Sequence, residues 1–248
     1  ELCFEPNDRL DITEYTQAAM VTTSIAMMKV LEENGVKPDV AAGLSLGEYC
    51  ALAAAGVMSE EDAITTVRQR GIFMQEEVPA GEGAMAAILA LDAAVIEEVT
   101  ADIDGVWIAN YNCPGQIVIS GSVPGIEKAC ELMKAAGAKR ALPLKVGGAF
   151  HSPLMDPAKV ELEAAINATE IHTPKCPVYQ NVDALPHTDP VEIKKNLVAQ
   201  LTASVRWTQS VKNMIADGAT DFTECGPGTV LQGLIKKIDG TVSAHGIA

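Results

Sequence analysis

Aromatic side chains, basic side chains and long apolar runs are all scarce in this 248-residue chain. Only 4% of the residues are aromatic although 48% are hydrophobic, so small aliphatic side chains make up most of the apolar part. That balance favours an α/β protein with closely packed helices. The 18 Lys and Arg are outnumbered by 33 Asp and Glu, which gives a net charge of −15. Without a basic stripe to neutralise phosphates, the sequence predicts no nucleic-acid partner.

Signals for a membrane, for export and for a metal are missing from the sequence as well. No apolar run approaches the roughly 20 residues of a transmembrane helix, and no signal peptide is present. The six cysteines form no CxxC pair, so free thiols in a reducing compartment explain them most simply. The four histidines lack metal-ligand spacing with the cysteines. We therefore expect a cytoplasmic protein with no membrane contact and no metal.

The segment Gly43-Leu44-Ser45-Leu46-Gly47 is the first positive signal. A short apolar run at 40–42 precedes it and a stretch rich in helix formers follows it, which is the strand-turn-helix context of a nucleophile elbow. We expect Gly43 and Gly47 to relieve crowding in the turn. The N–H of Leu46, at the helix start, is suited to stabilise an oxyanion. The alternative is an ordinary glycine-flanked serine between a strand and a helix.

A histidine suited to activate this serine follows about a hundred residues later, in Gly148-Ala149-Phe150-His151-Ser152. Together Ser45 and His151 predict acyl transfer through a covalent serine ester; a capping or core histidine is the alternative. No acidic residue is obviously placed as a third member. Asp183 and Glu224 are conceivable, and a backbone carbonyl would fix the histidine tautomer equally well.

Arg70 is the candidate for binding a charged substrate. On the helix predicted after Ser59, Arg70 falls about 60° from the middle of the apolar stripe, so it leans toward the interior. A buried cation needs a partner. A substrate carboxylate is one such partner, and an internal salt bridge or a snorkelling side chain is the alternative. Further candidate polar contacts, each with a turn or surface role as its alternative, are Gln17, Asn110, Asn112 and Gln200.

The order of predicted elements gives an α/β fold class with two domains. Predicted helices span 13–34, 46–55, 59–78, 92–101, 125–136, 156–168, 191–201 and 205–216, and predicted strands lie at 40–42, 84–91, 106–111, 116–120, 140–146, near 178 and at 221–223. A Pro/Gly-rich break falls at 79–83. The elements between 84 and 146 read β-α-β-β-α-β, the ferredoxin-like pattern. The sequence thus predicts a large hydrolase-like parallel-sheet domain, residues 1–81 and 147–248, with an inserted ferredoxin-like small domain at 82–146.

Six segments along the chain form an ordered set of motifs. They are Gly-Leu-Ser-Leu-Gly-Glu-Tyr (43–49), Arg-Gly-Ile-Phe-Met-Gln (70–75), Gly-Ala-Met-Ala-Ala (83–87), Asn-Cys-Pro-Gly-Gln-Ile-Val-Ile-Ser-Gly (112–121), Gly-Ala-Phe-His-Ser-Pro-Leu-Met (148–155) and Gly-Pro-Gly (226–228). Each is modestly specific, and the ordered set is very specific. Through it the chain closely resembles the malonyl-CoA:acyl-carrier-protein transacylase family of bacterial type II fatty acid synthesis. The resemblance implies the same two-domain fold.

The resemblance also implies roles for individual residues. Ser45 matches the nucleophile, His151 its base and Arg70 the clamp for the malonyl carboxylate. Gln200 matches the position whose main-chain carbonyl orients the histidine. The Gly-Ala-Phe-His stretch is similar to the version associated with malonyl rather than methylmalonyl selection, so Phe150 is expected to narrow the pocket.

The implied reaction is ping-pong transfer of a malonyl group from malonyl-CoA to holo acyl carrier protein. The carrier protein brings the pantetheine thiol, so the resemblance implies no cofactor held by this chain, and we expect a monomer. Candidate basic contacts for the carrier protein are the pairs Lys139-Arg140, Lys194-Lys195 and Lys236-Lys237, with plain solvation as the alternative.

The start of the chain departs from the family pattern. Family members usually open with a strand and a Gly-Gln-Gly-x-Gln turn, whose last Gln completes the oxyanion hole. Nothing after Glu1 matches it, and we expect that segment to be disordered, cleaved or omitted. Leu44 stands where many members carry a histidine, with little expected consequence. Two alternatives to the transferase are a serine esterase or thioesterase that uses water, and an inactive fragment or scaffold without its amino-terminal oxyanion segment.

Overall fold

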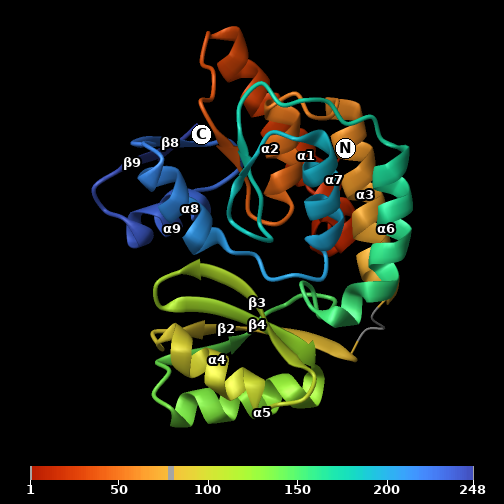
Figure 1. The fold of residues 1–248 in the computed structure, drawn as a ribbon. Helices are drawn as coiled ribbons and strands as arrows, with labels where there is room; N and C mark the ends of the chain where they lie inside the picture. The colour runs from red at the N-terminus through yellow and green to blue at the C-terminus, as the bar shows by residue number, and fades with distance from the viewer. Residues whose placement is uncertain (1, 78–80, 248) are drawn as a thin grey trace.

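The computed structural model describes residues 2–77 and 81–247. Val78, Pro79 and Ala80, where the sequence predicts the end of a helix and a break in the chain, lie outside the described residues. A helix-rich upper part carries both ends of the chain, and a lower part contains a four-stranded sheet with two helices (Figure 1). Phe150, the residue before the candidate base His151, packs against both parts.

Helices enclose a short three-stranded sheet in the upper part. In this sheet β1 (Ala41–Ala42) pairs in parallel with β6 (Val178–Tyr179), and β7 (Pro186–His187) pairs antiparallel with β6. The surrounding helices are α1 (Thr13–Glu33), α2 (Gly47–Ala54), α3 (Glu60–Glu77), α6 (Asp156–Ala168) and α7 (Pro190–Ala199). Fully buried side chains on these elements, including Val21, Leu52, Val67, Leu162 and Val178, form one apolar core.

This sheet is shorter and more mixed than the parallel sheet that the sequence predicts. Among the described strands, parallel pairing joins only β1 to β6 and β8 (Asp221–Glu224) to β9 (Ser243–Gly246). A strand of two residues is too short to show an apolar run or an alternating pattern, so its sequence does not indicate whether the neighbouring strand is parallel or antiparallel. β7 carried no sequence signal for the same reason.

The lower part is an antiparallel sheet backed by two helices. Its elements are, in chain order, β2 (Gly83–Leu89), α4 (Ala93–Ala101), β3 (Val106–Cys113), β4 (Gln116–Ser122), α5 (Val123–Ala135) and β5 (Arg140–Pro143), and the strand order is β3-β4-β2-β5. Asp92 caps α4 and Ser122 caps α5 by accepting backbone N–H bonds. Both helices lie on the sheet face that is turned away from the upper part (Figure 1). Ile88, Ile119 and Met133 are fully buried between helices and sheet.

The opposite face of this sheet meets the chain segment that holds the candidate base. Because side chains alternate along a strand, this face presents Met85, Ala109 and Val118, which pack with Phe150. The backbone N–H of Val205 donates to the carbonyl of Ala109 at 2.8 Å, so β3 is also joined to the segment after α7. The two parts therefore contact each other at Phe150, the residue before His151, and at Val205.

The carboxyl-terminal third differs most from the prediction. The helix predicted over 205–216 begins at Trp207 as α8 (Trp207–Ala216), because the Val205 backbone pairs with β3 instead. Helix α9 (Val230–Ile238) and strand β9 were not predicted at all. The other predicted helices agree with the structure to within two residues at each described end, and two short 3-10 helices, Arg9–Asp11 and Pro153–Met155, were not predicted. None of the helices in the described part of the chain has the length and apolar character needed to cross a bilayer.

Candidate active site

Ser45 stands in the tight turn between β1 and α2. Its φ is +51°, and His151 has a φ of +55°. Such left-handed conformations cost a non-glycine residue on the order of 1–3 kcal/mol and cluster at active sites. The strand-turn-helix context of a nucleophile elbow is therefore present around Ser45.

The two glycines of the turn contribute differently. A Cβ at Gly43 would lie 1.9 Å from the backbone oxygen of Gly47, so no side chain fits there. A Cβ at Gly47 would meet no described atom within 4 Å. The expectation that both glycines relieve crowding is right for Gly43 and wrong for Gly47. Gly47 is the first residue of α2 and has room for a side chain.

Ser45, His151 and Gln200 form a hydrogen-bonded relay. The Ser45 Oγ lies 2.6 Å from His151 Nε2, and His151 Nδ1 lies 2.9 Å from the main-chain oxygen of Gln200. A carbonyl only accepts hydrogen bonds, so Nδ1 carries the proton and Nε2 is free to accept the Ser45 proton. The carbonyl holds the tautomer, the task that an acid performs in a Ser-His-Asp triad.

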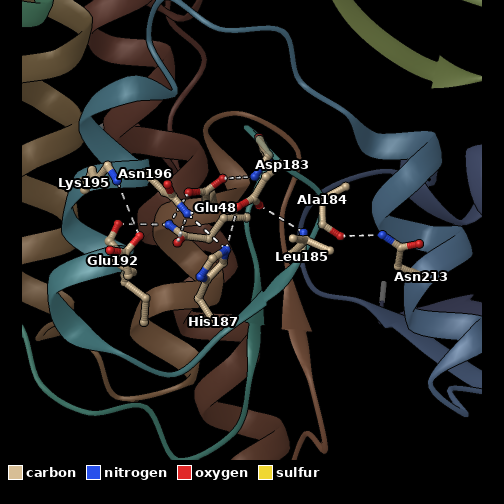
Figure 2. A network of polar contacts seen from close by, with 12 residues as sticks. Glu48, Asp183, Ala184, Leu185, His187, Glu192, Lys195, Asn196 and Asn213 are labelled. Atoms are coloured by element: carbon tan, nitrogen blue, oxygen red, sulfur yellow. Dashed lines mark hydrogen bonds and ion pairs between the residues drawn. The ribbon is translucent and has the colours of Figure 1, made fainter.

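The two conceivable acidic partners lie elsewhere. Asp183 is paired with His187 at 2.8 Å (Figure 2). The Glu224 carboxylate accepts the backbone N–H groups of Leu231 and Gln232 at the start of α9. Neither acid contacts His151, so the structure leaves the backbone carbonyl as the histidine's orienting group.

The histidine is held in its neutral form. His151 is 4% exposed, and burial, followed by the positive charge of Arg70, lowers its pKa from 6.5 to about 4. A neutral imidazole at physiological pH is the form that acts as a base.

Arg70 is buried beside the serine, as its helical position predicts. It is 1% exposed. Its Nη1 donates to Gln17 Oε1 at 2.8 Å, and its Nη2 donates to Ser45 Oγ at 3.2 Å and to Gln200 Oε1 at 3.3 Å. Among the residues that the structure describes, Arg70 forms no ion pair with an acid, and its Nε has no hydrogen-bond partner. The alternative of an internal salt bridge is therefore not observed.

Gln17 and Gln200 both lie at the site and are 5% and 1% exposed. Gln17 is on α1 and bonds Arg70, while Gln200 follows α7 and uses both its backbone and its side chain. Its Nε2 donates to the Ser45 carbonyl at 2.9 Å. The side-chain contacts of Gln200 had no sequence signal.

Leu46 and Phe150 flank the serine and the histidine in sequence. Leu46 immediately precedes α2, and no described group hydrogen-bonds its N–H. The N–H therefore remains available at the positive end of a helix, next to the Ser45 hydroxyl. Phe150 packs where the upper core meets the sheet.

Asn110 and Asn112 are not joined to this cluster. Both lie on β3. Asn110 is buried and its backbone pairs with Val205, and the Asn112 Oδ1 is buried without a partner among the described residues. The structure gives neither of them a hydrogen bond to Ser45, His151 or Arg70.

Sequence reasoning missed Glu48 and Asn181. The Asn181 Oδ1 accepts the Ser45 N–H at 2.6 Å, and the Glu48 carboxylate accepts the Asn181 N–H at 2.8 Å. One signal was available, because Asn181 follows β6 and the carboxyl ends of parallel strands β1 and β6 lie at one edge of the sheet.

Comparison with known proteins places the chain in a family. Residues 2–244 match the acyl transferase domain family. The chain is 51% identical to the malonyl CoA-acyl carrier protein transacylase of Bacillus subtilis, over 96% of this chain and 77% of that protein. It is 45% identical to the Escherichia coli K12 protein of the same name, over 98% of this chain and 80% of that protein. The chain belongs to the malonyl-CoA–acyl carrier protein transacylase family.

Solved structures of malonyl transacylases share the fold. An acyl carrier protein S-malonyltransferase from Vibrio cholerae superposes with a TM-score of 0.95 at 44% identity and covers 98% of this chain and 81% of its own. A malonyl-transacylase in complex with a type II PKS acyl-carrier protein superposes with a TM-score of 0.94 at 41% identity and covers 98% and 80%. The α/β fold is thus that of the transacylase family.

The contrast between the two elbow glycines is testable. Gly43→Ala should lower the free energy of unfolding by about 1–3 kcal/mol or more, because the added methyl group overlaps the Gly47 carbonyl. Gly47→Ala, the matched control, should change it by about 1 kcal/mol or less, since alanine is favoured in helices. Urea unfolding measures both, and equal losses would contradict the steric assignment.

The low pKa of His151 is testable by nuclear magnetic resonance. The ring resonances should still be those of the neutral form at pH 5 and change with a midpoint near pH 4, assigned by comparison with His151→Gln. Arg70→Met removes a lowering charge, so the midpoint should rise while burial keeps it below 6.5. A midpoint near 6.5 that is insensitive to Arg70 would contradict the assignment.

Proposed function

We propose that this protein transfers the malonyl group of malonyl-CoA to the pantetheine thiol of holo acyl carrier protein, and so supplies fatty acid elongation. The observation that carries the proposal is the buried Arg70, which has no described acidic partner and donates to the Ser45 Oγ at 3.2 Å. A cation held this close to a nucleophile suits an acyl group that bears its own carboxylate. The names of the relatives support the same substrate.

In the first half-reaction Ser45 is the nucleophile. Its Oγ attacks the thioester carbonyl while its proton passes to His151 Nε2, and the Leu46 N–H stabilises the developing oxyanion. The C–S bond then breaks, and the CoA thiolate takes the proton from His151. The product is malonyl-Ser45 and CoA.

The second half-reaction runs the same steps with another thiol. The pantetheine thiol gives its proton to His151 and attacks the malonyl-Ser45 ester. The C–O bond breaks, Ser45 Oγ regains the proton from His151, and malonyl carrier protein leaves. The carbonyl of Gln200 holds the imidazole in place throughout.

Arg70 has two roles in this proposal. Its guanidinium binds the malonyl carboxylate, and its bulk fills space in which a hydrolytic water would otherwise approach the ester. Gln17 orients the guanidinium, and Phe150, packed beside His151, narrows the pocket against a branched acyl group. Asn110 and Asn112 remain proposed substrate contacts on β3.

The proposal extends to partners and domains. Carrier protein as acceptor is supported by the related transacylase solved with one, and exposed basic pairs such as Lys236-Lys237 are candidate contacts on an acidic chain. We propose a cytoplasmic monomer that uses no metal or cofactor of its own. We also propose a hydrolase-like domain, residues 1–81 and 147–248, with an inserted ferredoxin-like domain at 82–146, whose element and strand order support that name.

Incubation with malonyl-CoA should add the mass of one malonyl group to Ser45, and Ser45→Ala should abolish the adduct. Intact-protein and peptide mass spectrometry measure both. A later addition of holo carrier protein should discharge the adduct. If a serine-reactive probe labels the protein but malonyl-CoA gives no adduct, the transferase proposal is contradicted. Rapid loss of malonyl groups to water without carrier protein would favour a thioesterase.

Arg70→Ala should lower the rate of malonyl loading about 10²-fold, as expected for losing charge-assisted bonds worth about 1.5–3 kcal/mol. Loading of acetyl-CoA, which has no carboxylate, should fall much less. The matched control is Arg68→Ala, which removes an exposed arginine from the same helix. Equal losses of malonyl and acetyl loading would remove the clamp role.

A further inference from the structure

The side chain of Asn181 spans the elbow by two backbone hydrogen bonds. Its Oδ1 accepts the Ser45 N–H at 2.6 Å and its Nδ2 donates to the Gly43 carbonyl at 2.7 Å. Asn181 is 1% exposed. Both bonds are made to the backbone and none to the Ser45 hydroxyl, so Asn181 holds the turn that aims the hydroxyl without touching the reacting atoms.

Glu48 closes this arrangement into a ring. The Glu48 Oε2 accepts the Asn181 N–H at 2.8 Å, and the Glu48 N–H donates to the Ser45 carbonyl at 3.1 Å. The three residues Ser45, Asn181 and Glu48 are thus linked in a circle, and we call them the elbow ring. The left-handed φ of Ser45 persists only where surrounding contacts over-determine it, and the ring supplies such contacts.

Glu48 is an unusual acid because it is completely buried and forms no ion pair within the described residues. Its Oε1 accepts the Gln180 Nε2 at 3.0 Å. Burial raises the pKa of Glu48 to about 7 despite these hydrogen bonds and the nearby Arg70 charge. A group that is costly to bury and lies one helical turn from the nucleophile points to a role that a hydrophobic residue would not fill.

A second set of polar contacts, made by Asn196, Asp183 and His187, supports the loop that carries Asn181. The Asn196 Nδ2, on α7, donates to the Gln180 Oε1 at 3.2 Å and to the Asp183 Oδ2 at 3.4 Å. Asp183 also pairs with His187. Figure 2 shows these contacts next to Glu48. On the far side of the same loop, the Asn213 Nδ2 donates to the Ala184 carbonyl at 2.9 Å. The Asn196 and Asp183 contacts thus support the part of the loop next to Asn181, whereas the Asn213 contact is made three residues further on, at Ala184.

We propose that Asn181 and Glu48 are positioning residues for acylation, which hold the Ser45 backbone in the conformation that aligns its hydroxyl with His151 and with the Leu46 N–H. This inference rests on the proposed function for its substrate. The substrate clamp Arg70 lies on α3, outside the elbow ring, so loss of the ring should change the rate of the chemical step and leave substrate binding largely intact.

The test compares Asn181→Ala with the matched control Asn213→Ala, which removes an amide from a backbone contact to the same loop. Single-turnover malonylation of Ser45 is followed by quenched-flow mass spectrometry over a range of malonyl-CoA concentrations. Asn181→Ala should lower the limiting rate constant about 10²-fold, the order of loss caused by a misplaced reacting group. The half-saturating concentration should stay within about threefold, and Asn213→Ala should match the wild type.

A fluorophosphonate probe measures the reactivity of Ser45 without malonyl-CoA. The probe reacts with an activated serine, so its rate should fall in Asn181→Ala by a similar factor, whereas its final stoichiometry should remain one per chain. A merely structural role would lower the stoichiometry and leave the rate per reactive site unchanged. If the wild type reacts with the probe but not with malonyl-CoA, the proposed function fails while the positioning inference is still tested.

Glu48→Gln is the second variant and decides the matter if Asn181→Ala does not fold. It keeps the size of the side chain, but its NH₂ group cannot accept a hydrogen bond. Either the Asn181 N–H or the Gln180 amide therefore loses its acceptor. Its limiting rate constant should fall by about tenfold or more at unchanged probe stoichiometry. If Asn181→Ala folds and keeps the wild-type rate constants, the proposal is overturned. If only Glu48→Gln folds, wild-type rate constants in that variant overturn it.

Discussion

The burial of the Arg70 guanidinium beside the Ser45 hydroxyl is the interaction on which the rest of the site depends. Desolvating a cation is costly unless a partner compensates it, and the described partners are two amide oxygens, a hydroxyl and the Tyr49 ring rather than an acid. The fold thus keeps a positive charge whose best partner is an incoming anion. The same charge, together with burial, lowers the pKa of His151, so the group that we propose for the substrate carboxylate also helps to keep the proposed base neutral.

The absence of an acid behind the histidine follows the same logic. A carboxylate at His151 Nδ1 would add a negative charge to a histidine that already senses the Arg70 charge, and it would compete with the malonyl carboxylate that we propose for Arg70. The Gln200 carbonyl fixes the tautomer without adding a negative charge. The group that orients the histidine is therefore neutral, beside a cation that we propose for an anionic acyl group.

Backbone geometry is the second constraint, and it is met by residues distant in sequence. Ser45 and His151 both have left-handed backbone conformations, and each is held by groups from another segment. Ser45 is bonded by Asn181 and by the Gln200 side chain, and His151 by the Gln200 carbonyl. One face of the lower sheet packs on Phe150, the residue that precedes the histidine.

The sequence by itself determined most of the helices and the candidate reactive groups, because these depend on local chemistry, whereas it missed α9, β7 and β9. Helical periodicity gave the helices and the inward direction of Arg70, and the motif around Ser45 gave the elbow. Only the tertiary structure decided what those groups touch: that Arg70 meets no described acid, that neither Asp183 nor Glu224 reaches His151, and that Asn181 and Glu48 bond the elbow. The Asn181 contacts join residues more than a hundred positions apart, and no local pattern encodes a pairing that arises only when β1 and β6 lie side by side.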